Sequence, residues 1–380
     1  MEENEAHKEP TGHNEAPNPS QVPSEESKGI PAAEGISAVP EVPAVPNITA
    51  PESVGSDNLE FKSRLDLTEL QRNVQNIRDE IGKVIVGQAD MIDMLIASLL
   101  AKGHSLIEGV PGIAKTVSAK LLAKTAAVGF SRIQFTPDLM PSDILGTSVF
   151  NLKNSEFEFK KGPIFSNMIL IDEINRAPAK TQAALFEVME ERQITMDGER
   201  YELAPPFMVL ATQNPVEQEG TYRLPEAQLD RFLFKINVSY PNLDEEIEIL
   251  NREHNLGGGA KTETINSFLT ASQIANYQDL VSKVYIEKHL LSYIAQIIVA
   301  TRNNQFLYLG ASPRASIAIL KASKAFAAMS GRDFVTPEDI KKAAIPVLHH
   351  RVIVTPEREM EGLTSDNIIK QIIEVTEIPR

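Results

Sequence analysis

A short segment of the sequence has the residue types and spacing needed to hold phosphate groups. An apolar run over residues 105–108 ends at Gly109, and a loop containing Gly112 leads to Lys115 and Thr116 at the start of a helical pattern. A strand, a glycine-containing loop and a helix in this order form an anion site from loop amides and the helix N-terminus. The lysine would reach the β- and γ-phosphates, and the threonine hydroxyl would bind Mg²⁺.

The predicted phosphate loop consists of Gly109, Val110, Pro111, Gly112, Ile113, Ala114, Lys115 and Thr116. Ala114 departs from the general pattern, which has glycine immediately before the lysine. We expect Ala114 to have helical dihedral angles at the start of the helix, where its methyl group is tolerated. On this segment alone, an ordinary glycine turn before a helix remains an alternative.

Two adjacent carboxylates at the end of another apolar run supply metal and base chemistry. Residues 168–171 lead directly into Asp172 and Glu173. Carboxylate oxygens suit Mg²⁺, so Asp172 would hold the ion and Glu173 would act as general base toward water. A buried strand with a solvated acidic end is the alternative. The apolar character of the run and its distance along the chain from Lys115 argue against that alternative.

One asparagine and three arginines are further candidates. Asn214 could orient the attacking water, although a plain strand-to-turn transition would also end in Asn-Pro. Arg231, before the last predicted strand, could project from one subunit into the nucleotide of its neighbour. Arg176 is a second candidate for this trans-acting role, and Arg314 could contact phosphate from a second domain. A surface salt bridge is the alternative for Arg231 and Arg314.

Length and composition limit the class of protein. The chain has 380 residues, a net charge of −15, a hydrophobic fraction of 42% and no cysteine. It can therefore form two ordinary domains, without disulfides or thiolate metal sites. We find no secretory signal and no apolar run long enough for a membrane helix, and we expect a cytoplasmic protein. The acidic balance argues against nucleic acid as the main substrate.

The chain divides into three parts. Residues 1–60 have twelve acidic side chains, two lysines and many prolines, a composition typical of a disordered tail. Residues 61–240 alternate apolar runs with helical patterns, which predicts an α/β domain with a parallel five-stranded sheet covered by helices. Residues 241–380 predict a smaller all-helical domain. The predicted strands cover residues 105–108, 132–135, 168–171, 207–211 and 233–238. The predicted helices cover residues 65–83, 88–102, 115–128, 244–254, 271–284, 288–301, 313–330, 337–350 and 366–375.

These segments together resemble the MoxR branch of the AAA+ ATPases, over roughly residues 65–360. The resemblance rests on Gly-Val-Pro-Gly-Ile-Ala-Lys-Thr at 109–116, Asp-Glu-Ile-Asn-Arg-Ala-Pro at 172–178, Ala-Thr-Gln-Asn-Pro at 211–215, and the stretches 132–146 and 224–232. It implies a P-loop AAA+ domain followed by a helical lid domain. It also implies hairpin insertions at 147–163 and 193–205, and it makes the alanine before the lysine the usual residue of this branch.

The resemblance implies roles for individual residues and two cofactors, ATP and Mg²⁺. Lys115 and Thr116 correspond to Walker A, Asp172 and Glu173 to Walker B, Asn214 to sensor 1, Arg231 to the arginine finger and Arg314 to sensor 2. Val86, Gly87 and Gln88 resemble the segment that lines the adenine pocket. Three histidines have no such role: we expect His104 at the surface, and His349 and His350 at a partly exposed helix end.

The function implied by the resemblance is that of an ATP-hydrolysing chaperone. Such a protein works as a hexameric ring and remodels or matures partner proteins, often ones with von Willebrand factor A domains or complexes that need a cofactor. A chelatase-like or nucleic-acid-acting AAA+ motor subunit is one alternative, because related branches share the insertions. A scaffold that binds nucleotide without hydrolysis is the other. The acidic balance disfavours the motor, and the filled catalytic positions disfavour the scaffold.

Overall fold

The computed structural model describes residues 65–215, 222, 224–256 and 265–379. All of them belong to one compact unit of the chain. The predicted tail over residues 1–60 lies outside the described residues. Among the helices that the structure describes, none has both the length and the apolar character needed to cross a membrane.

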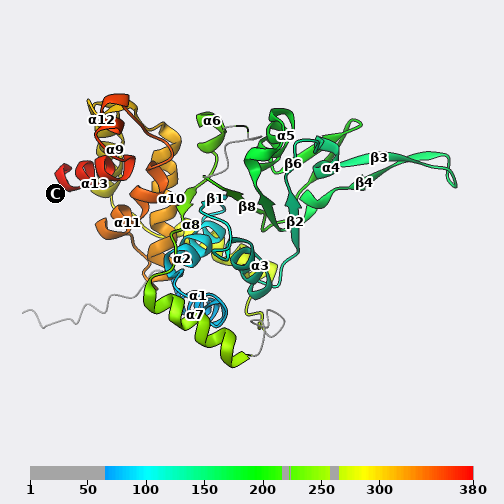
Figure 1. Ribbon diagram of the computed structural model, residues 1–380, viewed down its shortest axis with the longest axis horizontal. Coiled ribbons are helices and arrows are strands. Elements are labelled where there is room, and N and C mark those ends of the chain that lie inside the picture. The colour runs from blue at the N-terminus through cyan, green and yellow to red at the C-terminus, as the bar shows by residue number, and fades with distance from the viewer. Residues whose placement is uncertain (1–64, 216–221, 223, 257–264, 380) are drawn as a thin grey trace, which may run out of the picture. The chain divides into compact units, whose positions relative to one another are not determined.

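Five parallel strands form the central sheet, in the order β2-β5-β8-β1-β9 (Figure 1). They are β1 (Ser105–Glu108), β2 (Phe130–Gln134), β5 (Met168–Asp172), β8 (Met208–Gln213) and β9 (Phe234–Asn237). The predicted fold class is confirmed, and every strand begins and ends within two residues of its predicted range. Because the strands are parallel, their carboxyl ends all lie at one edge of the sheet.

Helices cover both faces of the sheet. They are α1 (Thr68–Gly82), α2 (Ala89–Leu100), α3 (Lys115–Thr125), α4 (Pro141–Leu145) and α5 (Ala179–Glu191). Met168 and Leu170 of β5 belong to a core shared with α1, α2 and α3. Ile169 and Ile171 belong to a separate core shared with α4 and α5. Since successive side chains of a strand point to opposite faces, a continuously apolar strand such as β5 holds both layers of helices in place.

Two antiparallel hairpins lie in the predicted insertions. The first pairs β3 (Gly146–Asn151) with β4 (Glu156–Lys161), and the second pairs β6 (Gln193–Met196) with β7 (Glu199–Glu202). Asp197 and Gly198 turn the second hairpin with φ of 53° and 83°, as a two-residue turn with positive φ requires. The hairpins contact each other, because the Ser148 hydroxyl donates a hydrogen bond to the Asp197 carboxylate.

The part of the chain that follows the sheet is mainly helical. Its elements are α7 (Leu243–Leu256), α8 (Ala271–Lys283), α9 (Lys288–Arg302), α10 (Pro313–Met329), α11 (Pro337–Leu348), α12 (Pro356–Met360) and α13 (Ser365–Val375), with a short antiparallel ladder of β10 (Leu307–Leu309) and β11 (Ile353–Val354). The ladder was not predicted, because two or three residues give no periodic pattern. Phe326 of α10 stacks on Phe234 of β9, with ring centroids 6.0 Å apart, so the lid packs directly on the sheet.

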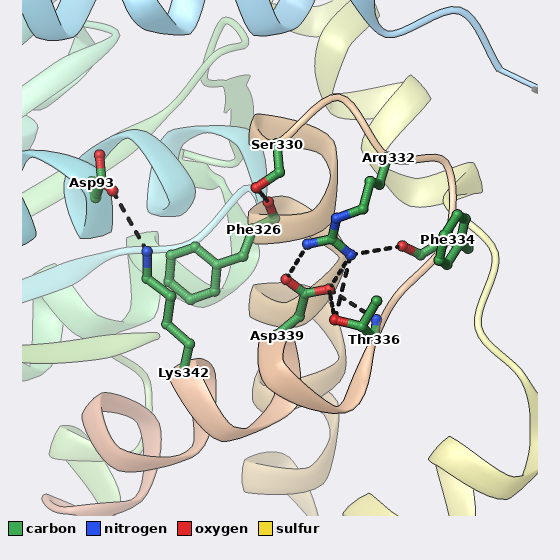
Figure 2. A network of polar contacts seen from close by, with 8 residues as sticks. All are labelled: Asp93, Phe326, Ser330, Arg332, Phe334, Thr336, Asp339 and Lys342. Carbon is green, nitrogen blue, oxygen red and sulfur yellow. Dashed lines mark hydrogen bonds and ion pairs between the residues drawn. The ribbon is translucent and has the colours of Figure 1, made fainter.

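The turn between α10 and α11 is fixed by one arginine (Figure 2). Arg332 donates two hydrogen bonds of 2.7 Å to the carboxylate of Asp339, one to each oxygen. The same carboxylate accepts hydrogen bonds from the backbone N–H and the hydroxyl of Thr336, which precedes α11. A two-pronged arginine–carboxylate pair of this kind fixes orientation as well as distance. The pair lies entirely within the lid.

His104 is buried, so the prediction of a surface position is wrong. Its side chain lies between the start of β1 and α5, where Nδ1 accepts the backbone N–H of Val209 at 2.9 Å and Nε2 lies 3.2 Å from the carbonyl oxygen of Met189. Burial is the main cause that lowers the pKa of His104 to about 4. His349 and His350 are also nearly covered by the protein, with Asp366 beside the first and the carbonyl of Phe232 beside the second.

The buried imidazole of His104 makes stability depend on pH. In the unfolded chain a histidine has a pKa near 6.5, so it becomes protonated below that pH. In the folded protein His104 stays neutral until the pH approaches 4, so protonation favours the unfolded state between these two values. The free energy of unfolding should therefore fall by up to about 1.4 kcal/mol per pH unit between about pH 6.5 and 4. Urea unfolding at pH 7, 6 and 5 measures this slope.

His104→Gln is the matched variant, because an amide can also accept from Val209 and donate to Met189. Its stability should fall less steeply with pH than that of the wild type. Some slope should remain, because burial also lowers the pKa of His350 well below 6.5. Equal slopes in the two proteins would show that His104 is not held neutral in the folded state.

Candidate functional site

A cavity of about 350 Å³ lies at the edge of the sheet where β1, β5 and β8 end and α3 begins. It is lined by Pro111, Gly112, Ala114, Lys115, Thr116, Val117, Arg132, Gln134, Asp172, Glu173, Thr212 and Asn214. The structure thus gathers the predicted phosphate, metal and base residues around one space. Its volume is in the range usual for small-molecule sites.

The phosphate loop contains two residues with left-handed backbone angles. Gly112 has φ of 90°, and Ala114 has φ of 61° and ψ of 18°. The prediction of helical angles for Ala114 is wrong, because this residue caps α3 and the first helical turn begins only at Lys115. A left-handed conformation costs a residue with a Cβ atom about 1–2 kcal/mol relative to the right-handed one. This cost explains why the general pattern has glycine at this position.

Lys115 lies across the ends of two neighbouring strands. Its ammonium group donates hydrogen bonds to the backbone carbonyls of Gly109, after β1, and of Gln213, at the end of β8, the latter at 3.5 Å. The amides of Lys115, Thr116 and Val117 precede the first intrahelical hydrogen bond of α3, from Ser118 N–H to Ala114 O. Amides and ammonium together can therefore bind an anion in this cavity.

Oxygen atoms suited to a magnesium ion meet at the end of β5. The hydroxyl of Thr116 lies 3.4 Å and that of Thr212 lies 3.2 Å from Oδ1 of Asp172, whose residue is only 6% exposed. The other carboxylate oxygen accepts a 2.6 Å hydrogen bond from Nε of Arg132 on β2. Hydroxyl and carboxylate oxygens are the ligands that Mg²⁺ prefers. Thr116 and Asp172 therefore fit the ion, and Arg132 balances the aspartate charge in this structure.

Glu173 follows Asp172 in a left-handed conformation, with φ of 57° and ψ of 53°. Its Oε2 accepts a 2.7 Å hydrogen bond from Gln134 and lies 3.1 Å from a guanidinium nitrogen of Arg176. Its backbone N–H donates to the hydroxyl of Thr212 at 3.1 Å. Asn214, 7% exposed, lines the same cavity. A carboxylate and an amide thus face the space beside the phosphate loop.

Arg231 and Arg314 line a different cavity, of about 330 Å³, together with His104 before β1. Arg231 donates a hydrogen bond to the carbonyl of Phe186 on α5, and its Nε lies 4.0 Å from Oε2 of Glu190. Arg314 donates to Oε1 of the same glutamate at 3.0 Å. This cavity is at the amino-terminal edge of the sheet, opposite the phosphate loop. Arg231 and Arg314 therefore share one carboxylate, far from the P-loop of their own chain.

The remaining predicted site residues lie outside the first cavity. The side-chain amide of Gln88 donates to the carbonyl of Ser239, just beyond β9, at 3.4 Å. Gly87 has φ of 76°, and the carboxylate of Glu245 occupies the space that a side chain there would need. These contacts place the segment Val86, Gly87 and Gln88 beside the end of β9. Of the loop residues, Gly109, Val110 and Ile113 do not line the cavity.

Four functional contacts were missed from the sequence. Arg132, Gln134, Thr212 and Glu190 hold Asp172, Glu173 and the two arginines of the second cavity. A signal existed for Arg132 and Gln134, because they are polar residues two apart in a predicted strand and so share one face. No sequence pattern indicated a role for Glu190, since its contacts with Arg231 and Arg314 depend on how α5 packs against the lid.

Fold and site define an AAA-type P-loop ATPase domain with a lid. Residues 104–234 match the ATPase family associated with various cellular activities (AAA), and residues 299–372 match the AAA lid domain.

Similar proteins show to which branch of the AAA+ ATPases the chain belongs. The chain is 45% identical to the uncharacterized protein YeaC of Bacillus subtilis, over 79% of this chain and 93% of that protein. It is 40% identical to Chaperone MoxR1 of Mycobacterium tuberculosis, over 79% of this chain and 81% of that protein. A crystal structure from Cytophaga hutchinsonii matches with a TM-score of 0.76 and 43% identity, covering 82% of this chain and 97% of that one. The chain belongs to the MoxR family of AAA+ ATPases.

The strained alanine of the phosphate loop can be tested by Ala114→Gly. Removing the Cβ relieves about 1–2 kcal/mol of strain, and the greater freedom of unfolded glycine offsets about 0.5–1 kcal/mol of it. The variant should therefore be up to about 1.5 kcal/mol more stable. Ala127 also has a positive φ, 44°, but does not line the cavity.

Ala127→Gly is thus the control: both variants should resist urea better, whereas only Ala114→Gly should alter ATP affinity. A loss of stability in Ala114→Gly would contradict the left-handed assignment.

Proposed function

We propose that this protein hydrolyses ATP with Mg²⁺ and works as a ring of identical subunits that remodels partner proteins. The observation that supports the proposal most is the division of the catalytic residues between two edges of one sheet. Lys115, Asp172 and Glu173 surround the cavity at the carboxyl edge, whereas Arg231 lies at the amino edge. Family membership supports the ATPase class.

Each group at the carboxyl edge has a defined task in the proposed reaction. The loop amides and the ammonium of Lys115 bind the phosphates, and Thr116 and Asp172 hold Mg²⁺. The ion, when bound, neutralises charge on the β- and γ-phosphates. Glu173 accepts a proton from the water that attacks the γ-phosphorus, while the bond to the bridging oxygen breaks and ADP leaves. Asn214 orients that water.

Distance supports a role for Arg231 on another subunit. β1 spans four residues between the two edges, which is about 13 Å at about 3.3 Å per residue. Arg231 cannot cross the sheet to the phosphates of its own chain. A neighbouring copy with its amino edge against this cavity would bring an arginine to the γ-phosphate. Repetition of such a head-to-tail contact closes a ring when the rotation allows. Six subunits is the number that the resemblance implies.

The proposed partner is a protein, with von Willebrand factor A domains as the first type to test. One relative bears the name chaperone. The β3–β4 hairpin exposes Phe150, Leu152 and Phe157, by 45%, 85% and 75%, and exposed apolar groups of this kind suit contact with another protein. Stimulation of hydrolysis by DNA that disappears with added salt would instead support a nucleic-acid-acting motor.

Complementation tests the shared site. Glu173→Gln should bind ATP normally and lose turnover by about 10²–10⁴-fold, because it keeps the shape but not the base. Arg231→Ala should lose about 10³–10⁵-fold, as arginine fingers do elsewhere. In an equal mixture, sites built from the intact Glu173 of one variant and the intact Arg231 of the other should function. About a quarter of the sites should then be active if subunits mix at random in a ring.

Specific activity of the wild type should also rise with protein concentration. Glu374→Gln, at an exposed position of α13, is the control for the amide substitution and should leave turnover unchanged. A mixture no more active than its two components, with activity independent of concentration, would rule out a site shared between subunits.

A further inference from the structure

Arg351 is a buried arginine of the lid that makes a full set of hydrogen bonds. It follows α11, and its side chain is 3% exposed. A guanidinium group carries five N–H donors. Here Nε donates to Oδ1 of Asp230 at 2.6 Å, Nη2 donates to the carbonyls of Asp230 and Phe232 at 2.9 and 2.5 Å, and Nη1 donates to those of Leu233 and Val347 at 3.2 and 2.5 Å. Every donor thus has an acceptor.

Four of these five hydrogen bonds reach the loop that carries Arg231. Their acceptors lie on Asp230, Phe232 and Leu233, the residues on either side of Arg231. Two other lid residues contact the same loop: Ser312 donates to Oδ2 of Asp230 at 2.9 Å, and His350 Nε2 lies 3.2 Å from the carbonyl of Phe232. The lid therefore holds the backbone of the loop from both sides of Arg231.

The side chain of Arg231, by contrast, rests on the AAA domain. It donates to the carbonyl of Phe186 and lies near Glu190, both on α5. Glu190 also accepts from Arg314 of the lid at 3.0 Å. The backbone of this loop is thus bound by the lid on both sides of Arg231, and the N–H of Leu233 also donates to the carbonyl of His104 before β1 at 2.7 Å, while the functional side chain contacts α5. A movement of the lid relative to α5 would displace the guanidinium of Arg231.

From these contacts we propose that Arg351 is a positioning residue that couples the lid to the trans-acting arginine, so that the lid position of one subunit sets hydrolysis in its neighbour. The inference rests on the proposed function, since it needs Arg231 to act across a subunit interface. It assigns Arg351 no contact with nucleotide. A rigid set of five donors suits this task, because it binds three carbonyls and a carboxylate of the loop and one carbonyl of α11 at once. A lysine ammonium cannot match that geometry.

Arg351→Lys tests the coupling while it retains the charge. Small misplacement of a catalytic group can cost about 10²-fold in rate. We expect kcat to fall by about 10–100-fold, with KM for ATP within about twofold of wild type, because the variant's own phosphate site is intact. Mixed with Glu173→Gln, the variant should regain activity, as Arg231→Ala does, because the defect lies in the arginine that it supplies to its neighbour.

Arg332→Lys is the matched control (Figure 2). Arg332 also binds an aspartate through two nitrogens, but it lies within the lid and does not touch residues 230–233. It should lower thermal stability without changing kcat by more than about twofold. If Arg351→Lys fails to fold, Ser312→Ala removes only the hydroxyl contact to Asp230. It should lower kcat by about 2–5-fold, with KM retained and the same recovery in the mixture.

Recovery of activity in the mixtures distinguishes the positioning role of Arg351 from the site shared between subunits. Recovery of Arg231→Ala but not of Arg351→Lys in mixtures with Glu173→Gln would overturn the positioning role alone. Wild-type kcat in Arg351→Lys, or a loss that appears mainly in KM for ATP, would also overturn it. If Arg231→Ala itself does not recover, the site shared between subunits is wrong and this inference is wrong with it.

Discussion

The common direction of the five sheet strands is the constraint on which the rest of the structure depends. Parallel strands place every carboxyl end at one edge. Because β5, β8 and β1 are neighbours in the sheet, the phosphate loop after β1, the carboxylates at the end of β5 and the polar end of β8 lie next to one another. The same geometry sends the loops before β1 and β9 to the other edge. The residues at that edge, Arg231 among them, lie away from the phosphate loop of their own chain and would face a neighbouring molecule in the proposed ring.

Charged side chains at both edges have hydrogen-bond or ion-pair partners within the chain. Lys115 binds two backbone carbonyls, Arg132 binds Asp172, and Glu190 binds both Arg231 and Arg314. Each of these contacts occupies a group that the proposed reaction needs. In the proposed ring, a bound nucleotide and a neighbouring subunit would replace these internal partners with new ones. The affinity for each would then depend on how much stronger the new contacts are than the internal contacts that they replace.

Features with a local sequence pattern could be predicted, whereas contacts between distant parts of the chain could not. The strands, the Lys115 loop and the Asp172-Glu173 pair have local patterns, and the structure contains them where the patterns indicate. The backbone angles of Ala114 were predicted wrongly because the helix begins one residue later than expected, so Ala114 is the cap of α3 and not its first helical residue. His104 was misjudged because its burial comes from α5, far along the chain. The contacts of Arg351 could not be predicted either, since they join the lid to a loop 118 to 121 residues earlier.

In the proposed ring, one subunit completes the active site of the next. A cryo-EM structure of assembled Glu173→Gln with ATP and Mg²⁺ would reveal whether this contact between subunits forms. We expect the guanidinium of Arg231 to leave Phe186 and Glu190 and to lie about 3 Å from a γ-phosphate oxygen of the ATP bound to the neighbouring subunit. ATP bound at Lys115 with every Arg231 still on its own Phe186, and no neighbour over the cavity, would contradict it.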